Sequence, residues 1–329
     1  MKKSDVSRQY RKKYPDMPTL KLARLIYSEN NLLFKDVEDA RVNLRYIAGK
    51  LGAVNRKAVV NSEFLETEDR PKNPYNLPKS EEIDYTPFVI KGYKKVGIMS
   101  DIHLPYHNIE SITAAISYFK NEKIDALLLN GDTIDCYSLS RFSKDPKKRD
   151  FKYELDTLKA FVEILDKELG AKIFFKIGNH EVRYERFLQE KAHELRGVEE
   201  FEFSNIIKAR ANGIDIIDSN RYMKLNSLNG IHGHEYIGGI SAPVNVARGL
   251  YLRGKVSAFQ GHNHSTSEHT ESDMNGKITT TWSIGCLCEL NPAYMPLNKW
   301  NWGAALVELD SNGEDFKFHN KRIYKGKIL

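Results

Sequence analysis

The 329-residue sequence has few cysteines and no long hydrophobic run. Its three cysteines, Cys136, Cys286 and Cys288, do not make a disulfide framework, and the last two lie too close together for a zinc knuckle. No apolar stretch approaches the roughly 18 residues that a membrane-spanning helix needs. The basic N-terminus lacks the apolar segment of a secretory signal. We therefore expect a cytoplasmic protein without a membrane span.

The net charge of +6 is concentrated near the N-terminus. Residues 1–57 contain 14 basic and 6 acidic side chains, whereas residues 58–90 contain 3 and 7. A basic segment attracts phosphate backbones, so nucleic acid is an expected partner of residues 1–57. An ordinary solvated helix surface explains the same charges, and at this point both interpretations stay open.

Residues 1–57 are expected to form a basic helical module. One amphipathic helix is indicated from Thr19 to about residue 31, and a second is capped by Asp36 and ends before Gly49. Two helices with a short connection resemble a helix-turn-helix unit.

An acidic, proline-containing stretch follows, at residues 58–90. It carries four of the eleven prolines and predicts an extended linker, clearest from residue 61 to residue 87. The remaining residues, 91–329, are expected to form the main domain.

In residues 91–329 strands alternate with helices and then predominate, which predicts a layered α/β domain. The expected helices are 109–120 and 151–169. The expected strands are 95–99, 126–129, 172–177, 228–231, 256–259, 278–282, 304–309 and 316–324.

Five of these strands run directly into polar motifs, and ligands collect at such strand ends in α/β proteins. The motifs are Asp101-Ile102-His103, Gly131-Asp132-Thr133-Ile134-Asp135, Gly178-Asn179-His180-Glu181, Ile231-His232-Gly233-His234 and Gly261-His262-Asn263-His264. Each alone has a structural explanation as a turn, a helix cap or a surface imidazole. Together, their carboxylate, amide and imidazole groups suit two Mn²⁺, Fe²⁺ or Zn²⁺ ions.

The order of these motifs is similar to that of the calcineurin-like metallophosphoesterases, over roughly residues 93–285. This resemblance implies a four-layer fold, in which a β-sandwich is flanked by helices and two metals lie at the strand ends.

The resemblance also implies two ligand sets that share Asp132. The first ion would be bound by Asp101, His103, Asp132 and His264. The second would be bound by Asp132, Asn179, His232 and His262. His234 is an alternative to His232, which is preferred because it directly follows its strand. His180 would stand beside the metals as a general acid, oriented by Asp135.

The implied activity is hydrolysis of a phosphodiester, in nucleic acid or a nucleotide, by a metal-bridging hydroxide. Two metal ions activate such a nucleophile and stabilise in-line displacement, and a nearby His can protonate the leaving group. Mn²⁺ is the expected metal, with Fe²⁺ and Zn²⁺ as alternatives. Two other functions stay open: a phosphomonoesterase for a small metabolite, and a binding adaptor that uses the domain as a scaffold.

The substrate itself is weakly specified. Ser/Thr protein phosphatases carry Arg where this chain has Cys136, so that activity is disfavoured. Arg183 or Arg141 are candidate phosphate clamps and Tyr106 is a candidate stacking residue, although each also fits ordinary surface or packing roles.

Overall fold

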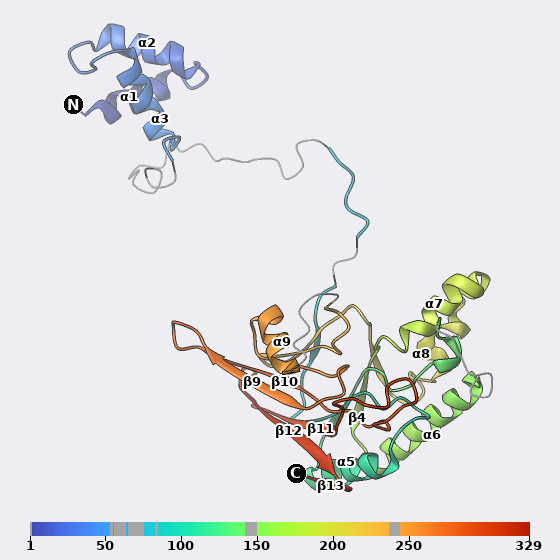
Figure 1. The fold of residues 1–329 in the computed structure, drawn as a ribbon. Coiled ribbons are helices and arrows are strands. Elements are labelled where there is room, and N and C mark those ends of the chain that lie inside the picture. The colour runs from blue at the N-terminus through green and yellow to red at the C-terminus, as the bar shows by residue number, and fades with distance from the viewer. Residues whose placement is uncertain are drawn as a thin grey trace. The chain divides into compact units, whose positions relative to one another are not determined.

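The computed structural model describes residues 2–52, 55, 64, 76–82, 85–141, 150–236 and 244–329. The chain divides into two compact units, Met1–Glu82 and Ile83–Leu329, which we describe separately (Figure 1). No helix among the described residues is both long and apolar enough to cross a bilayer.

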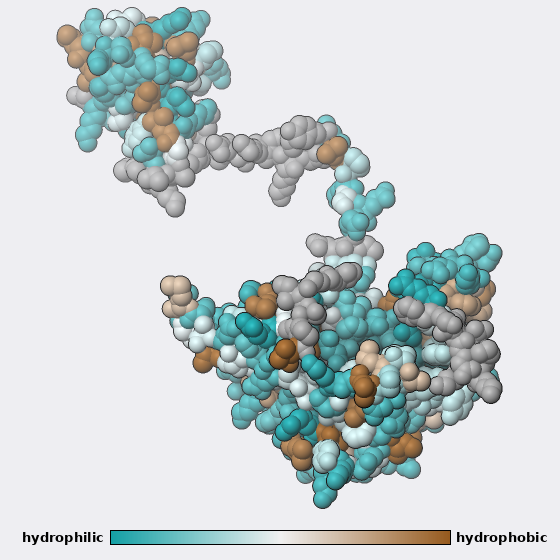
Figure 2. Space-filling model, viewed as in Figure 1, coloured by the Kyte–Doolittle hydropathy of each residue, from teal (hydrophilic) through white to brown (hydrophobic). Residues whose placement is uncertain are grey.

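Among its described residues, the first unit contains three helices, α1 (Lys3–Lys13), α2 (Thr19–Glu29) and α3 (Val37–Ile47). They enclose a small core that includes Leu22 and Leu44. Asp36 caps α3 as expected, accepting a hydrogen bond from the main-chain N–H of Asp39. Helix α1 forms in addition to the two expected helices. In Figure 2 the visible face of this unit is mostly hydrophilic.

The predicted linker, residues 58–90, lies largely outside the described residues. Its last three residues differ from the expectation. They form strand β1 (Phe88–Ile90), which pairs in parallel with β6 (Met223–Leu225). Ile90 is buried between the sheets of the second unit and Phe88 packs against the same core, whereas Val89 is exposed.

The second unit is built on two sheets. One has the strand order β13-β12-β11-β2-β3-β4-β5, and the other has the order β1-β6-β7-β8-β10-β9. The strands of the first sheet are β2 (Lys95–Met99), β3 (Ala126–Asn130), β4 (Lys172–Lys176), β5 (Asp215–Ile217), β11 (Trp302–Leu309), β12 (Phe316–Tyr324) and β13 (Lys327–Ile328). The remaining strands of the second are β7 (Leu228–Gly230), β8 (Ala258–Gln260), β9 (Ser267–Ser272) and β10 (Ile278–Ser283).

The helical elements of the second unit connect these strands. Among the described residues they are α5 (Ile109–Glu122), η1 (Tyr137–Leu139), α6 (Phe151–Leu169), α7 (Val182–Lys191), η3 (His193–Leu195), η4 (Glu199–Phe201), α8 (Phe203–Ile206) and α9 (Val246–Gly254).

Alternating side chains explain why the central strands are hydrophobic throughout. In β3, Ala126 and Leu128 face the core between the two sheets, whereas Leu127 and Leu129 join the core that includes α5 and α6. On the far side of the sandwich, α9 packs on β8, β9 and β10. The layers are therefore helices, sheet, sheet and helix, and the expected four-layer fold is confirmed.

Candidate metal centre

The polar motifs meet because the strands that carry them are neighbours. Strands β2, β3 and β4 are adjacent and parallel, and so are β7 and β8 in the other sheet. Main-chain hydrogen bonds join successive loops: Asp101 N–H donates to Gly131 O, and His103 N–H donates to Asp132 O. The loops therefore form one connected framework at the strand ends.

Five of the predicted metal ligands have a left-handed backbone. Their φ angles lie between 50° and 65° at Asp101, His103, Asp132, His262 and His264. Such angles are uncommon for residues other than glycine, and they cluster at functional sites, where the surrounding structure maintains the strain. At these positions the turn directs each side chain toward a shared centre.

The first predicted ligand set forms a continuous chain of donor atoms. His264 Nε2 lies 3.2 Å from Asp101 Oδ1 and 3.2 Å from His103 Nε2. His103 Nε2 in turn lies 3.9 Å from Asp132 Oδ2. The structure thus brings together all four residues of this set.

The second set converges on the same Asp132 oxygen. His232 Nε2 lies 3.3 Å from Asp132 Oδ2 and 3.1 Å from Asn179 Oδ1. A possible metal-binding group contains Asp132, His232 and His262, but His234 is not part of it. Among the described residues, the arrangement therefore favours His232 over His234.

The donor atoms fit divalent metal ions. Nitrogen and oxygen ligands bind such ions at about 2.0–2.2 Å, which places two ligands of one ion roughly 3 Å apart. The 3.2 Å separation between the Nε2 atoms of His103 and His264 matches this spacing. His262 Nδ1 is buried without a hydrogen-bond partner among the described residues, as expected of an atom that awaits a metal.

Charges at the site are strongly coupled. Burial opposes ionisation of Asp101, but the His264 imidazole lowers the pKa of this carboxyl to about 2. Burial likewise opposes a charge on His232 and His264. Asp132 nevertheless raises the pKa of His232 to about 10, and Asp101 raises that of His264 to about 10. The carboxylates thus remain charged and require nearby positive charge, which divalent ions supply when bound.

His180 stands beside the two ligand sets. Its Nε2 lies 3.8 Å from Asp132 Oδ2, and its Nδ1 donates to the main-chain oxygen of Asp135 at 2.9 Å. Arg183 Nη2 donates to His180 Nε2 at 2.9 Å. Burial would lower the pKa of His180, but the negative charge of Asp132 raises it. His180 can therefore take up a proton at Nε2 once Arg183 moves aside.

The position of Asp135 differs in detail from the expectation. Its carboxylate Oδ2 lies 3.0 Å from His103 Nδ1 and 3.4 Å from His180 Nδ1. The Asp135 carboxylate therefore lies closer to His103 than to His180. His180 Nδ1 lies closer to the main-chain oxygen of Asp135 than to its carboxylate. The carboxylate orients a predicted metal ligand as well as the predicted general acid.

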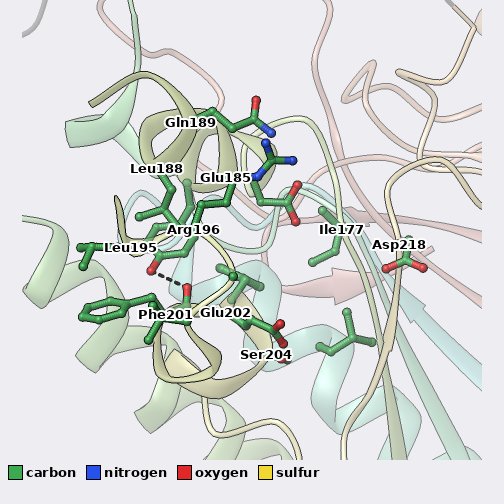
Figure 3. Close-up of a pocket in the computed structure, with 15 residues that line it drawn as sticks. Ile177, Glu185, Leu188, Gln189, Leu195, Arg196, Phe201, Glu202, Ser204 and Asp218 are labelled. Atoms are coloured by element: carbon green, nitrogen blue, oxygen red, sulfur yellow. Dashed lines mark hydrogen bonds between the residues drawn. The ribbon is translucent and has the colours of Figure 1, made fainter. Parts of the chain in front are cut away.

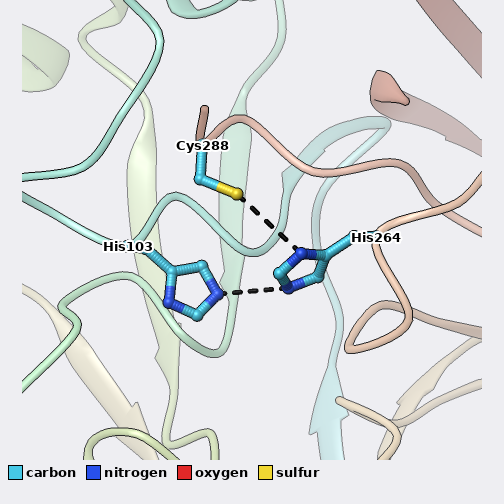
Figure 4. Close-up of side chains that lie close together, drawn as sticks. All are labelled: His103, His264 and Cys288. Atoms are coloured by element: carbon cyan, nitrogen blue, oxygen red, sulfur yellow. Dashed lines mark hydrogen bonds between the residues drawn. The ribbon is translucent and has the colours of Figure 1, made fainter. Parts of the chain in front are cut away.

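Cys288 was not predicted to take part in the site. Its sulfur lies 3.8 Å from His264 Nδ1 (Figure 4). The other ring nitrogen, Nε2, is the one that lies near Asp101 and His103. Metal-binding imidazoles usually donate their second N–H to an acceptor that fixes the ring. No spacing in the sequence signals this contact, because it depends on how the loop between β10 and β11 packs against the loop that ends in His264.

Glu181 is a second residue whose role the sequence did not reveal. It is buried, and its carboxylate accepts hydrogen bonds from the main-chain N–H groups of Asp132, Thr133, Ile134 and Gly178. Burial raises the pKa of Glu181 to about 7 despite these donors. This side chain ties the loop after β3 to the loop after β4.

The predicted substrate residues have different surroundings. Arg183 Nη1 donates to the main-chain oxygen of Asp135 at 3.0 Å, so Arg183 is part of the His180 environment. Arg141 is exposed, two residues beyond η1. Tyr106 is half-buried, with its ring centroid 6.1 Å from that of Tyr137.

Comparisons with known proteins place the chain in a family. The family model of the calcineurin-like phosphoesterases matches residues 94–281. The Gene 54 protein of Mycobacterium phage L5 is 25% identical over 236 residues, covering 68% of this chain and 91% of that protein.

Two solved structures are also similar. Vps29 from Entamoeba histolytica, complexed with Zn²⁺, is 11% identical with a TM-score of 0.38, over 71% of this chain and 96% of that one. A dimetal phosphatase from Danio rerio is 11% identical with a TM-score of 0.37, over 72% of this chain and 98% of that one. With the family model matching more than half of its length, the chain belongs to the calcineurin-like phosphoesterase family.

Proposed function

We propose that the second unit, Ile83–Leu329, is a metal-dependent phosphodiesterase that acts on nucleic acid or a nucleotide. Membership of the family supports phosphoester hydrolysis in general. The observation that carries the proposal is the position of Asp132 Oδ2, which lies within 4 Å of Nε2 of His103, His180 and His232. One carboxylate oxygen thus joins both ligand sets and reaches the proposed general acid.

In this proposal Asp101, His103, Asp132 and His264 bind one divalent ion, and Asp132, Asn179, His232 and His262 bind the other. Two such ions activate a water molecule and neutralise charge on the phosphoryl oxygens. Oxygen and imidazole nitrogen ligands suit Mn²⁺, Fe²⁺ and Zn²⁺, and we propose Mn²⁺ as the metal with the other two as alternatives.

The chain's own groups manage the proton that the leaving oxygen needs. His180 Nδ1 is fixed on the main-chain oxygen of Asp135, which leaves Nε2 as the atom that delivers a proton. Arg183 donates a hydrogen bond to that atom. A phosphate group that arrives at the site attracts the Arg183 guanidinium away from His180. His180 Nε2 is then free to be protonated. Arg183 would then bind the phosphate while His180 acts as the acid.

An activity panel tests this proposal. Protein loaded with Mn²⁺ is assayed against bis-p-nitrophenyl phosphate, p-nitrophenyl phosphate, single- and double-stranded DNA, RNA and cyclic nucleotides. Preferential hydrolysis of diesters supports the proposal. Preference for p-nitrophenyl phosphate would favour the phosphomonoesterase alternative, and no hydrolysis by protein that holds both metals would favour the adaptor.

We further propose that residues 1–57 bind nucleic acid and bring the phosphodiesterase to it. The support is the charge excess of this segment, including exposed Lys12 and Lys13 in α1 and Lys21 and Arg24 in α2. Replacing Lys13, Lys21 and Arg24 with Gln should weaken DNA binding and reduce its salt slope by roughly one per lost phosphate contact. Unchanged affinity at low salt would contradict the proposal.

A further inference from the structure

A large cavity opens beside the proposed second metal site. It has a volume of about 680 Å³, and its lining includes Asn179 and His262, which belong to the second ligand set. The other walls come from α9, the loop after β7, the loop after β8 and the segment before β11. We call it the side cavity. Its volume falls within the roughly 300–1,000 Å³ of small-molecule sites, so it offers more room than a phosphate group alone needs.

The charge of the side cavity favours an anion. Arg253 and Lys299 lie in its lining, and no Asp or Glu is among the described residues that line it. A second cavity, of about 330 Å³, shows the contrast. It is lined by Glu185, Glu202 and Asp218 with Arg196 as its one cation among the described residues, and Arg196 lies next to Glu185 (Figure 3). That acidic cavity is unsuited to a phosphate ester.

The side cavity also offers flat aromatic surfaces. Tyr236 and Trp300 both line it, beside apolar side chains such as Leu250 and Met295. The Arg253 guanidinium lies 5.6 Å from the Tyr236 ring centroid and donates to the Tyr236 main-chain oxygen. An aromatic side chain can stack on any nucleic-acid base, because every base has a flat face. A cation beside the aromatic ring strengthens the binding of a base that carries a phosphate.

We propose that the side cavity binds the nucleoside unit attached to the phosphate that the metals hold, with Tyr236 stacking on the base and Arg253 attracting the phosphate. This inference rests on the proposed function, because it assumes that a phosphoester lies at the metal centre. It adds the place where the nucleoside of that substrate binds, and it predicts that a nucleoside-containing ester binds in preference to a simple alkyl ester.

Direct binding measurements test the proposal without relying on turnover. Calorimetry on the full chain loaded with Mn²⁺ compares thymidine 5′-monophosphate with methyl phosphate, which share the phosphate group and differ in the nucleoside. Stacking on one aromatic face predicts that the nucleotide binds about 5- to 150-fold more tightly. Equal affinities would overturn the proposal. Phenyl phosphate is a third ligand, and affinity equal to that of the nucleotide would also overturn it, since a plain aromatic ring would then be sufficient.

Variants locate the effect. Tyr236→Ala should reduce the affinity ratio between nucleotide and methyl phosphate toward one, and Tyr236→Phe should restore it because the ring is kept. Tyr153→Ala is the matched control, since Tyr153 is an exposed tyrosine on α6, outside the side-cavity lining. A ratio in Tyr236→Ala equal to that of the control would contradict the assignment.

Hydrolysis of methyl p-nitrophenyl phosphate separates this inference from the proposed function. Hydrolysis together with equal affinities for the two ligands would overturn the nucleoside site and leave the phosphodiesterase in place. Absence of hydrolysis of any ester, with tighter nucleotide binding retained, would overturn the phosphodiesterase and support the nucleoside site.

Discussion

The Glu181 carboxylate makes a quantitative prediction possible, because its partners are fully defined. Oε1 accepts from Thr133 N–H at 2.7 Å and Ile134 N–H at 3.1 Å, and Oε2 accepts from Asp132 N–H at 3.0 Å and Gly178 N–H at 2.8 Å. The side chain is only 1% exposed, so water cannot readily replace these bonds. Glu181 therefore fixes the backbone that carries Asp132.

Glu181→Gln keeps the shape of the side chain and replaces one acceptor oxygen with an NH₂ donor. Whichever oxygen is replaced, two main-chain N–H groups then face a donor instead of an acceptor. Above about pH 8, where Glu181 is ionised, hydrogen bonds to its charged carboxylate contribute about 1.5–3 kcal/mol each, so losing two costs about 3–6 kcal/mol. A neutral amide is less costly to bury than a carboxylate, which offsets part of this loss. We expect the free energy of unfolding to fall by about 2–4 kcal/mol.

Tryptophan fluorescence isolates the unit concerned. All three tryptophans, at positions 282, 300 and 302, lie in the second unit, so urea unfolding followed by their emission reports on that unit. Glu190→Gln is the matched control, because Glu190 is exposed on α7. An unfolding free energy for Glu181→Gln within about 0.5 kcal/mol of the control would refute the reasoning.

Three further substitutions test two residues of the site and buried Glu154 of α6, which accepts hydrogen bonds from the main-chain N–H groups of Tyr137 and Ser138. His180→Ala should keep its metals yet lose about 10²–10⁴-fold in rate on a nucleotide diester, with a smaller loss on a nitrophenyl ester, whose leaving group needs no proton; equal losses would exclude the general-acid role. Cys288→Ala should weaken metal binding by about 10- to 100-fold in calorimetry, whereas Cys286→Ala should not, and matching affinities would show that the Cys288 sulfur does not position His264. Burial raises the pKa of Glu154 to about 7, so the folded state binds this proton more tightly than the unfolded chain and stability falls as the pH rises from about 4.5 to about 7. Glu181 contributes a decline over the same pH range, so Glu154→Gln should reduce the slope in urea unfolding curves without abolishing it, and an unchanged pH profile would show that Glu154 does not contribute.

The central strands and the site at their ends were predictable from the sequence, because hydrophobic runs that end in polar motifs mark them. Strands β2, β3 and β4 are apolar on both faces because each contributes to two cores, and such runs are easily recognised. The motifs after them converge because parallel neighbouring strands end at the same edge. The side chains of both proposed ligand sets therefore lie close to one another, as the order of the motifs implied. The metal centre itself stays a proposal.

The missed elements lack a signal of that kind. Helix α1 buries Val6 as its one large apolar side chain in the core, so no hydrophobic period reveals it. Strand β9 has the polar sequence Ser-Glu-His-Thr-Glu-Ser and forms because it pairs with β10 at the edge of its sheet. Strand β1 depends on a partner more than 130 residues away, β6. Such pairings depend on tertiary context and leave little trace in local sequence.

The contacts of Arg183 and Cys288 were unpredictable for a related reason. Arg183 reaches His180 because α7 begins directly after the Gly-Asn-His-Glu loop, and the sequence alone offered a phosphate clamp and a surface arginine as equal alternatives. Cys288 meets His264 through two loops that are 24 residues apart. In both cases the sequence shows what the residue type can do chemically, but it does not show which residue lies next to it in the fold.

The central claim is that Asp132 joins two metal sites, and metal stoichiometry tests it most directly. Elemental analysis and calorimetry with Mn²⁺ compare the wild-type chain, Asp132→Asn and the control Asp166→Asn, whose side chain is exposed on α6. We predict about two ions per chain in the wild type and the control, and weaker binding at both sites in Asp132→Asn. Two ions bound with unchanged affinity in Asp132→Asn would contradict the account.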